Sequence, residues 1–477
     1  SSCHASGAAG ASACPPTPTG PGGEPVNDAV YVVHQPLTGN GTITVRVTSL
    51  TGEYSADGAP LTPSGAGDTS GVQPWSKAGI MVSAGTAQGS AYAAMLATGG
   101  NGVRMQWNYT GDTAGLPGAV SASSPRWLRL VRSGNTVTGY DSADGTHWTL
   151  VNSVTLGGLP GTVQVGLFAT SPSYQSMTTS LGASSGFASP SRATGTFDDV
   201  DLNWPGAGGS WTHTSVGRGN GTEGSPLVTG PGPFTYAGGT FTVTGSGDIG
   251  PSVPGDPDGS GADPEELLST VVIGLIMMII VAALFITAEY RRRMIAVTFA
   301  ASPRRGRVIA AKSVVIGAVT FAAGAAGAVA ALLLGAHFAR SAGNLMLPDP
   351  ALTRIRMIAG VGAMLAVCAV LALALGALVR RGIAAITVVV VVIFVPFMLA
   401  TIQDLLPLGT EEWLLRVTPA AAFAVVQDVP AYHQVIAQYT PAGGYFPLSW
   451  WAGLAVLCAW AAAALAAATY VLRRRDA

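Results

Sequence analysis

The chain has 477 residues, of which 10% are charged and 48% hydrophobic, and its formal net charge at pH 7 is −1. The mean hydropathy of +0.41 is typical of a chain with a large membrane-embedded part and argues against a wholly water-soluble protein. The lack of excess positive charge gives no support to a nucleic-acid-binding function.

Residues 1–25 are rich in Gly, Pro, Ser and Ala, and this composition predicts a flexible leading segment. Cys3 and Cys14 lie in it, where an extracellular location would permit a disulfide between them. Cys368 and Cys458 lie in apolar segments and are interpreted as small packing residues.

The region 26–204 contains short β-branched and aromatic runs separated by Gly, Asn and Asp. Apolar and polar residues alternate at 42–47 and 127–132, as expected of antiparallel strands with one buried face. The clusters at 133–135 and 143–145 predict turns with positive φ. Many short strands with regular turns predict an all-β sandwich.

The order of several motifs in this region resembles bacterial concanavalin A-like (laminin G-like) jelly-roll domains. These motifs are WSKAGIMV at 75–82, WLRLVRSGN at 127–135, DGTHW at 144–148, VGLFAT at 165–170 and FDDV at 197–200. The resemblance implies an extracellular jelly roll, and such domains often bind carbohydrate or serve as spacers. Trp107, Tyr109 and Trp148 are therefore candidates for stacking on a sugar ring, with packing in the core as the alternative.

Catalysis by this domain is not predicted. Glucanases with this jelly roll place paired carboxylates on one strand, and no Glu-x-Asp-x-x-Glu arrangement occurs in the sequence. The acidic residues Asp198, Asp199 and Asp201 are interpreted as a solvated or turn-bonding face. No metal site is predicted.

Residues 205–264 are rich in Gly, Ser and Pro and are interpreted as a linker, in which the run 239–244 could form a small appended β-element. The stretch 256–261 resembles a calcium loop, but Leu267 stands where the closing glutamate should be. The linker interpretation is therefore preferred.

From 265 to 477 the sequence predicts an all-α membrane domain. A hydrocarbon core about 30 Å thick requires roughly 20 apolar residues in a helix. Five segments without a charged residue meet this length, namely 267–288, 313–336, 357–379, 382–403 and 449–472. Core helices of soluble domains would be shorter and amphipathic.

Basic residues gather at every second boundary between these spans. They are Arg291, Arg292, Arg293, Arg304, Arg305, Arg307 and Lys312, then Arg380 and Arg381, then Arg473, Arg474 and Arg475. The alternate boundaries carry Arg340, Arg354, Arg356 and Arg416. The positive-inside rule places the crowded side and the C-terminus in the cytoplasm, and residues before about 265 outside. This topology predicts a further segment before Ser1, either a cleaved signal or, preferably, a first transmembrane helix.

The segment 289–306 connects the first two spans and is predicted to form a short basic helix that ends at Ser302-Pro303. Its arginines could simply bind anionic headgroups and fix the topology. Alternatively, the helix could transmit motion from a cytoplasmic motor domain.

This segment resembles the first cytoplasmic stretch of ABC-2-type transporter permeases common in actinobacteria, where a Glu-Tyr-Arg start and a Pro-Arg-Arg-x-Arg-Val end bracket a coupling helix. The matching residues are EYR at 289–291, TF at 298–299, PRRGRV at 303–308 and AK at 311–312, followed by TPAAAF at 418–423, GYFPL at 444–448 and WAG at 451–453. The chain departs from the pattern at Ala288, Arg293 and Met294.

The resemblance implies that one set of residues forms or flanks the surface that docks an ATP-binding subunit, namely Glu289, Tyr290, Arg291, Pro303, Arg304, Arg305 and Arg307. Glu289 is expected to pair with an arginine at the membrane edge. The chain itself carries no ATPase motif, because Ala311 stands where a phosphate loop requires Gly before Lys312. ATP and Mg would thus be bound by a separate partner, and the resemblance also implies a second permease unit.

Two further features of the spans carry predictions. The stretch 417–427 lies in the predicted outer segment 405–448, as either a re-entrant helix or a helix on the membrane surface. Gly324, Gly327 and Gly335 predict close approach of helices in the second span.

The sequence as a whole thus predicts a two-part protein, an extracellular β-sandwich followed by a multi-pass membrane permease. It would act in ATP-driven export of a lipid-like or amphipathic substrate without an ATPase of its own. The alternatives are a membrane-anchored receptor or adhesin that binds glycan and a tethered hydrolase.

Overall fold

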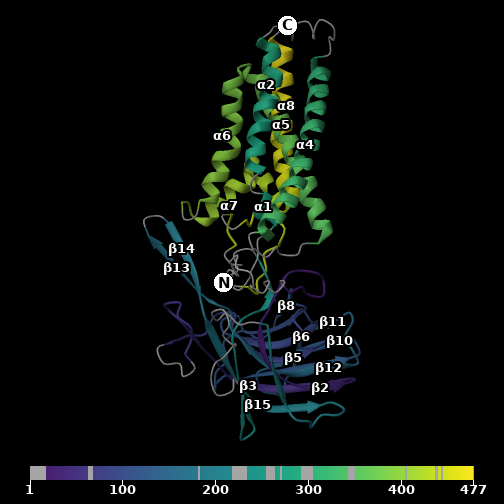
Figure 1. Cartoon of the computed structure of the whole chain (residues 1–477), viewed down its shortest axis with the longest axis vertical. Coiled ribbons are helices and arrows are strands. Elements are labelled where there is room, and N and C mark those ends of the chain that lie inside the picture. The colour runs from purple at the N-terminus through teal and green to yellow at the C-terminus, as the bar shows by residue number, and fades with distance from the viewer. Residues whose placement is uncertain are drawn as a thin grey trace.

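The computed structural model has two parts, an all-β region and a bundle of helices, at opposite ends of an elongated molecule (Figure 1). We call the end of the bundle next to the strands the sandwich end and the opposite end the far end. The structure describes residues 18–62, 68–180, 183–217, 234–253, 264–268, 271–291, 305–341, 350–402, 405–435, 439–441 and 444–475.

Two antiparallel sheets form the sandwich. One has the strand order β11-β10-β9-β3-β15-β18-β17, with β4 at β3, and the other has the order β16-β2-β12-β5-β6-β7-β8. The strands of the first sheet are β3 (Gly41–Tyr54), β4 (Thr69–Ser70), β9 (Arg126–Ser133), β10 (Thr136–Ser142), β11 (Thr149–Thr155), β15 (Ser191–Asn203), β17 (Phe234–Ala237) and β18 (Thr240–Gly245). Those of the second are β2 (Val30–Thr38), β5 (Lys77–Ser83), β6 (Tyr92–Thr98), β7 (Val103–Trp107), β8 (Gly111–Ala114), β12 (Thr162–Thr170) and β16 (Thr212–Val216).

The alternation predicted in the sequence is present in the first sheet. Ile43, Val45 and Val47 of β3 and Leu128 and Leu130 of β9 are fully buried between the two sheets. Side chains of a strand alternate between its two faces, so the residues between these point to the outside of the sandwich. The predicted turns are also confirmed, since the turn glycines 134 and 145 have φ of 61° and 77°.

The second sheet is buried on both faces at its centre. Every residue of β5 and β6 is buried, and the face turned away from the first sheet carries a second apolar cluster that includes Met81, Tyr92 and Phe168. A ribbon of β1 (Val26–Asp28) and β19 (Ile249–Pro251) contributes to this cluster. A second ribbon, β13 (Tyr174–Ser180) and β14 (Ala183–Ser189), projects from the sandwich (Figure 1).

The sandwich extends beyond Trp204, the boundary predicted from the sequence. β16 pairs with β2, β18 pairs with β15, and β19 pairs with β1. The run 239–244 is thus an integral strand of the first sheet and not a separate β-element. Residues 218–233 and 254–263 of the predicted linker lie outside the described residues.

Five of the described helices are long and apolar enough to cross a membrane, as predicted. They are α2 (Val271–Arg291), α4 (Arg305–Ser341), α5 (Ala351–Val379), α6 (Gly382–Thr401) and α8 (Trp450–Arg475). Shorter elements at the sandwich end are α1 (Pro264–Leu268), α7 (Leu408–Val417) and the 3-10 helix η1 (Pro419–Val426). The central helix is α5, which packs against α2, α4, α6 and α8.

Small residues permit the closest helix contacts. A Cβ atom on Gly324 of α4 would lie 2.7 Å from Leu365 and 3.3 Å from the Cα of Gly362 on α5. A Cβ on Gly335 would lie 3.0 Å from Leu267 of α1, whereas Gly327 has nothing within 4 Å. The close approach predicted for these three glycines is therefore confirmed at Gly324 and Gly335 and is wrong at Gly327, which faces open space.

Candidate functional site

The far end of the bundle brings together the helix ends that the sequence analysis predicts to lie on the cytoplasmic side. It contains the end of α2, the start of α4, the α5–α6 connection and the end of α8 (Figure 1). Arg307 is exposed there, and Arg380 and Arg381 connect α5 to α6. Arg380 ends α5 with a left-handed backbone of φ 56°, and its N–H donates to the carbonyl of Gly376 at 2.9 Å.

An ion pair joins the two helices that flank the predicted coupling segment. The ammonium of Lys312 on α4 donates to Oε1 of Glu289 on α2, and it lies 5.2 Å from the ring centre of Phe285. Only 16% of the Lys312 side chain and 22% of the Glu289 side chain are exposed, so the pair is shielded more than a surface salt bridge. The described partner of Glu289 is thus this lysine and not the arginine that the sequence analysis expected.

The other predicted docking residues fall at the edges of the described chain. Tyr290 and Arg291 are the last two residues of α2, and Arg305 is the first residue of α4. Pro303 and Arg304 lie outside the described residues, as do Cys3 and Cys14. The structure therefore brings Glu289 and Arg307 to the same end of the bundle and leaves the docking role of the set as a prediction.

The sandwich end of the bundle contains a fully buried 3-10 helix. All eight residues of η1 are buried, and η1 packs against α8, α5, α6 and α7. A Cβ atom on Gly453 of α8 would lie 2.1 Å from the carbonyl oxygen of Ala421, and one on Gly360 of α5 would lie 3.0 Å from Val425. Two glycines thus allow η1 to lie against both helices, and the segment packs within the bundle rather than on its surface.

Gln427 ends η1 and connects it to its neighbours. Its carbonyl accepts a hydrogen bond from the guanidinium of Arg356 on α5, and its side-chain Oε1 accepts one from the N–H of Phe446 at 3.2 Å. Its amide also donates to the carbonyl of Val429 at 3.1 Å. The end of η1 is therefore fixed both to α5 and to the segment that leads into α8.

Tryptophans mark the sandwich end of the bundle. Trp413 of α7 and Trp450 and Trp451 of α8 are exposed by 61%, 41% and 62%. Tryptophan is enriched at the interface between hydrocarbon and headgroups, so these side chains indicate where a bilayer would end.

The three aromatic residues considered for glycan contact lie in different environments. Trp107 packs partly buried against the core between the sheets, and Trp148 is half-buried with the guanidinium of Arg129 3.7 Å from its ring centre. Tyr109 is only 2% exposed. Its ring offers no face to solvent, and the three residues do not form one platform.

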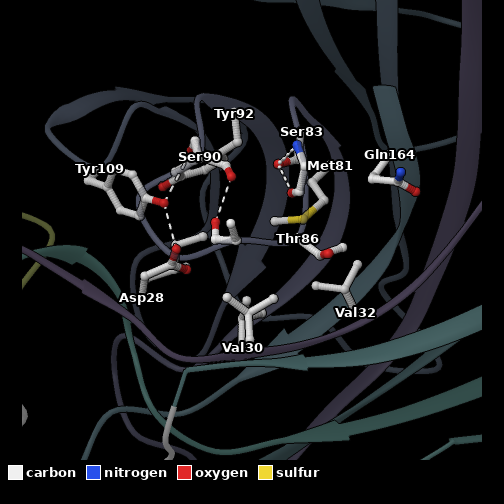
Figure 2. Close-up of a pocket in the computed structure, with 14 residues that line it drawn as sticks. Asp28, Val30, Val32, Met81, Ser83, Thr86, Ser90, Tyr92, Tyr109 and Gln164 are labelled. Carbon is white, nitrogen blue, oxygen red and sulfur yellow. Dashed lines mark hydrogen bonds between the residues drawn. The ribbon is translucent and has the colours of Figure 1, made fainter. Parts of the chain in front are cut away.

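A small pocket lies on the outer face of the second sheet (Figure 2). Its cavity volume is about 20 Å³, which is room for about one water molecule and not for a sugar ring. The carboxylate of Asp28 lines it and accepts hydrogen bonds from the hydroxyl of Tyr109 at 2.7 Å and from the N–H of Gly89 at 2.8 Å. Burial raises the pKa of Asp28 from 3.8 to about 6, although both hydrogen bonds oppose the shift.

This pKa predicts how the stability of the sandwich depends on pH. Because the folded-state pKa of Asp28 lies above the unfolded value, the folded protein favours the neutral carboxyl. The stabilisation from this carboxyl is therefore fully present below about pH 4 and is lost as the pH rises through 6. A shift of this size corresponds to about 3 kcal/mol. Asp28→Asn should therefore flatten the decline in unfolding free energy between pH 4 and 7, measured by urea denaturation of the full chain. A decline identical to that of the wild type would show that Asp28 does not titrate in this range.

Sequence reasoning missed several residues at these sites. The sequence places Lys312 among the basic residues of the predicted cytoplasmic side but does not identify it as the partner of Glu289, because a position 23 residues further along gives no helical spacing signal. Asp28 and Gln434 have partners that are distant in the sequence and could be found only from the fold.

No curated protein matches the chain. Among solved structures, scytalido-glutamic peptidase with a peptide-based transition state analogue is 8% identical, with a TM-score of 0.25, over 46% of this chain and 99% of that one. A functionally unknown protein from Saccharomyces cerevisiae is 17% identical, with a TM-score of 0.18, over 36% of this chain and 73% of that one.

A mutant of the GH43 protein BlXynB from Bacillus licheniformis is 15% identical, with a TM-score of 0.17, over 27% of this chain. The match spans only 24% of that protein's length. TM-scores this low carry no conclusion about the function of this chain.

A family comparison covers much more of the molecule. The match begins at residue 76, at the edge of β5, and runs through both sheets and all five candidate spans to residue 477. It therefore includes most of the sandwich as well as the far end with its Glu289–Lys312 pair and the buried η1. On this match, and with five helices apolar enough to span a membrane, the chain belongs to the ABC-2 family transporter proteins.

Proposed function

We propose that the chain is the permease subunit of an ATP-driven transporter, with its far end in the cytoplasm and its sandwich outside the cell. The observation that carries the proposal is the family match over residues 76–477, which makes the chain a membrane subunit of an ABC transporter. The positive-inside rule supports the orientation, because the far end carries Arg307, Arg380 and Arg381 together with the basic ends of α2 and α8.

The far end is the proposed docking surface for a separate ATP-binding subunit, which would hold ATP and Mg. The chain leaves α2 at Arg291 and enters α4 at Arg305, both at this end, and the Glu289–Lys312 pair fixes the two helix ends to each other. A force applied to the connection by a moving partner would thus reach α2 and α4 together. The resemblance noted in the sequence supports Glu289, Tyr290, Arg291, Pro303, Arg304, Arg305 and Arg307 as the docking residues.

The transported substrate is proposed to be lipid-like or amphipathic, moving outward. The five predicted spans contain no charged residue, which suits a substrate with an apolar portion. A second permease unit and membrane lipid are the further partners that the family resemblance suggests. For the sandwich we propose a lectin-like role, with the partly exposed Trp148 as the candidate contact for a cell-wall glycan.

Co-purification tests the proposal directly. The full chain, extracted from its own membranes, is expected to retain an ATP-binding subunit with measurable ATPase activity. Arg304→Glu/Arg305→Glu is expected to release that subunit, because two reversed charges at the docking surface replace attraction by repulsion. Arg340→Glu reverses an exposed charge at the opposite end of the same helix and should leave the complex intact.

A different result is expected if the chain is instead a glycan-binding receptor. In that case no ATPase accompanies the wild-type chain, and cell-wall glycan is retained instead. Release by Arg340→Glu to the same extent as by the double variant would also contradict the docking surface, since it would show a general loss of structure.

A further inference from the structure

The sandwich and the bundle meet at a buried glutamine. Gln434 lies in the connection between η1 and α8 and is 2% exposed. Its side-chain amide donates to the carbonyl oxygens of Tyr109 at 3.2 Å and Thr110 at 2.9 Å, in the β7–β8 turn of the sandwich. A buried amide that spans two parts of a molecule loses both hydrogen bonds if the parts separate, so this contact favours one relative position.

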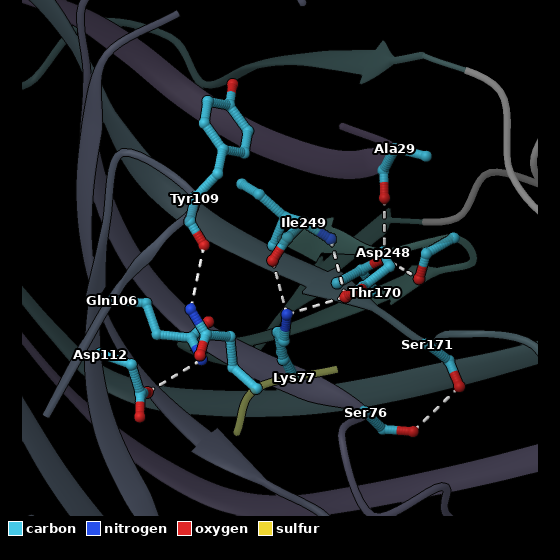
Figure 3. A network of polar contacts seen from close by, with 12 residues as sticks. Ala29, Ser76, Lys77, Gln106, Tyr109, Asp112, Thr170, Ser171, Asp248 and Ile249 are labelled. Atoms are coloured by element: carbon cyan, nitrogen blue, oxygen red, sulfur yellow. Dashed lines mark hydrogen bonds and ion pairs between the residues drawn. The ribbon is translucent and has the colours of Figure 1, made fainter. Parts of the chain in front are cut away.

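The turn that accepts these hydrogen bonds is held firmly in place. Asn108 and Tyr109 both have positive φ, 44° and 66°, a conformation that Asn tolerates in turns but that is uncommon for a bulky residue such as Tyr. The N–H of Tyr92 donates to the side chain of Asn108 at 3.2 Å, and the hydroxyl of Tyr109 donates to Asp28. Figure 3 shows Tyr109 and the neighbouring Lys77–Asp248 pair in this part of the sandwich.

Apolar contacts surround the glutamine contact. Val253, which follows β19, is buried with Val435 and Tyr445 of the η1–α8 connection. A Cβ atom on Gly250 of β19 would lie 3.8 Å from a methyl group of Val435. The strand that leaves the sandwich therefore packs against the same connection that Gln434 anchors.

The anchored connection begins at η1. Gln427 ends η1 and is held by Arg356 of α5 and by Phe446, just before α8. Seven positions later in the chain, Gln434 is held by the sandwich. The segment after η1 is thus fixed at one end by the bundle and farther along by the outer domain.

We infer that the sandwich positions the membrane bundle: by holding Gln434, it keeps η1 seated between α5 and α8. Gln434 is a positioning residue, and it reaches η1 through the connection 427–434. Any effect of Gln434 on transport rests on the proposed permease function, but the positioning of η1 by Gln434 does not.

Hydrogen exchange of the full chain in nanodiscs tests the positioning without any partner. Gln434→Ala is expected to raise amide exchange rates across 419–435 by about tenfold or more, because the loss of two buried hydrogen bonds releases the connection. Gln35→Ala is the matched control. Gln35 is also buried and donates to a backbone carbonyl, that of Gly209 at 3.0 Å, but within the sandwich and not at the bundle. Gln35→Ala should leave the exchange rates in 419–435 unchanged. Equal effects of Gln35→Ala and Gln434→Ala on these rates would overturn the inference.

A covalent link should rescue the defect. Gly250→Cys/Val435→Cys, added to Gln434→Ala in a background whose four natural cysteines are replaced, places two thiols in segments that pack together, since a Cβ atom on Gly250 would lie 3.8 Å from a methyl group of Val435. Oxidation is expected to restore wild-type exchange in 419–435, and a reductant should abolish the rescue. Formation of the disulfide without rescue of the exchange rates contradicts the inference.

ATP hydrolysis by the complex with the ATP-binding subunit extends the test to function. Gln434→Ala should retain the partner but change the ATPase rate severalfold, and the disulfide should reverse the change. If the wild-type chain binds no such partner, the proposed function fails while the exchange experiment still decides the positioning. If the partner binds and the exchange and ATPase rate of Gln434→Ala match the wild type, the inference alone fails.

Discussion

Replacing Asp248 by alanine is expected to lower the free energy of unfolding of the sandwich by about 3–5 kcal/mol, because it leaves a buried charge without its partner. Lys77 on β5 is completely buried, and its ammonium donates to Asp248 at 2.7 Å and to the carbonyl of Ile249 at 2.5 Å (Figure 3). The Asp248 side chain is only 4% exposed. A loss of this size is a large part of the roughly 5–15 kcal/mol that stabilises a typical domain.

Urea-dependent proteolysis of the full chain, with fragments of the sandwich identified by mass spectrometry, measures this loss. Lys77→Met/Asp248→Leu removes both charges together and should recover most of the stability. Glu412→Ala breaks the partly exposed Arg416–Glu412 pair of α7, in the bundle, and should change the stability of the sandwich by no more than about 0.5 kcal/mol. A loss in Asp248→Ala as small as in Glu412→Ala would show that Lys77 does not depend on this partner.

The second large effect is expected at Gly453, where Gly453→Ala should destabilise the bundle by about 1–3 kcal/mol. The added methyl group would lie 2.1 Å from the carbonyl oxygen of Ala421, so either η1 or α8 must move. The contact is with backbone, which cannot change rotamer to make room. We therefore expect a lower thermal midpoint of the full chain in nanodiscs and a reduced ATPase rate in the complex.

Gly327→Ala is the matched control for this substitution. It also adds one methyl group to a glycine of a membrane helix, but nothing lies within 4 Å of the new atom. Alanine favours a helix over glycine by up to about 1 kcal/mol, so this variant should be neutral or more stable. If both variants lower the midpoint equally, the cause is not the contact with η1.

Much of the architecture follows from local patterns in the sequence. Span length and lack of charge are sufficient to identify the five long helices, and the predicted segment 382–403 differs from α6, Gly382–Thr401, by two residues at one end. Alternation in 42–47 identifies β3 because one face of that strand is buried and the other is not.

Pairing over long distances could not be predicted in the same way. The run 239–244 has the composition of a strand, but the linker around it hides that its partner is β15. Tyr109 looks like an exposed aromatic residue in a turn, and only the fold brings Asp28 within reach of its hydroxyl. The Lys77–Asp248 pair likewise joins residues 171 positions apart, where no spacing rule applies.

The β1–β19 ribbon has a consequence for how such a protein can change over evolution. Val26 lies opposite Pro251, so the chain enters and leaves the sandwich at neighbouring points, which are about 5 Å apart in an antiparallel pair. A segment whose ends are this close can be lengthened, shortened or exchanged for another module without moving the helices that follow it. Recombination could therefore vary the sandwich while the bundle stays the same, provided that each new module offers backbone carbonyls that accept the hydrogen bonds of Gln434.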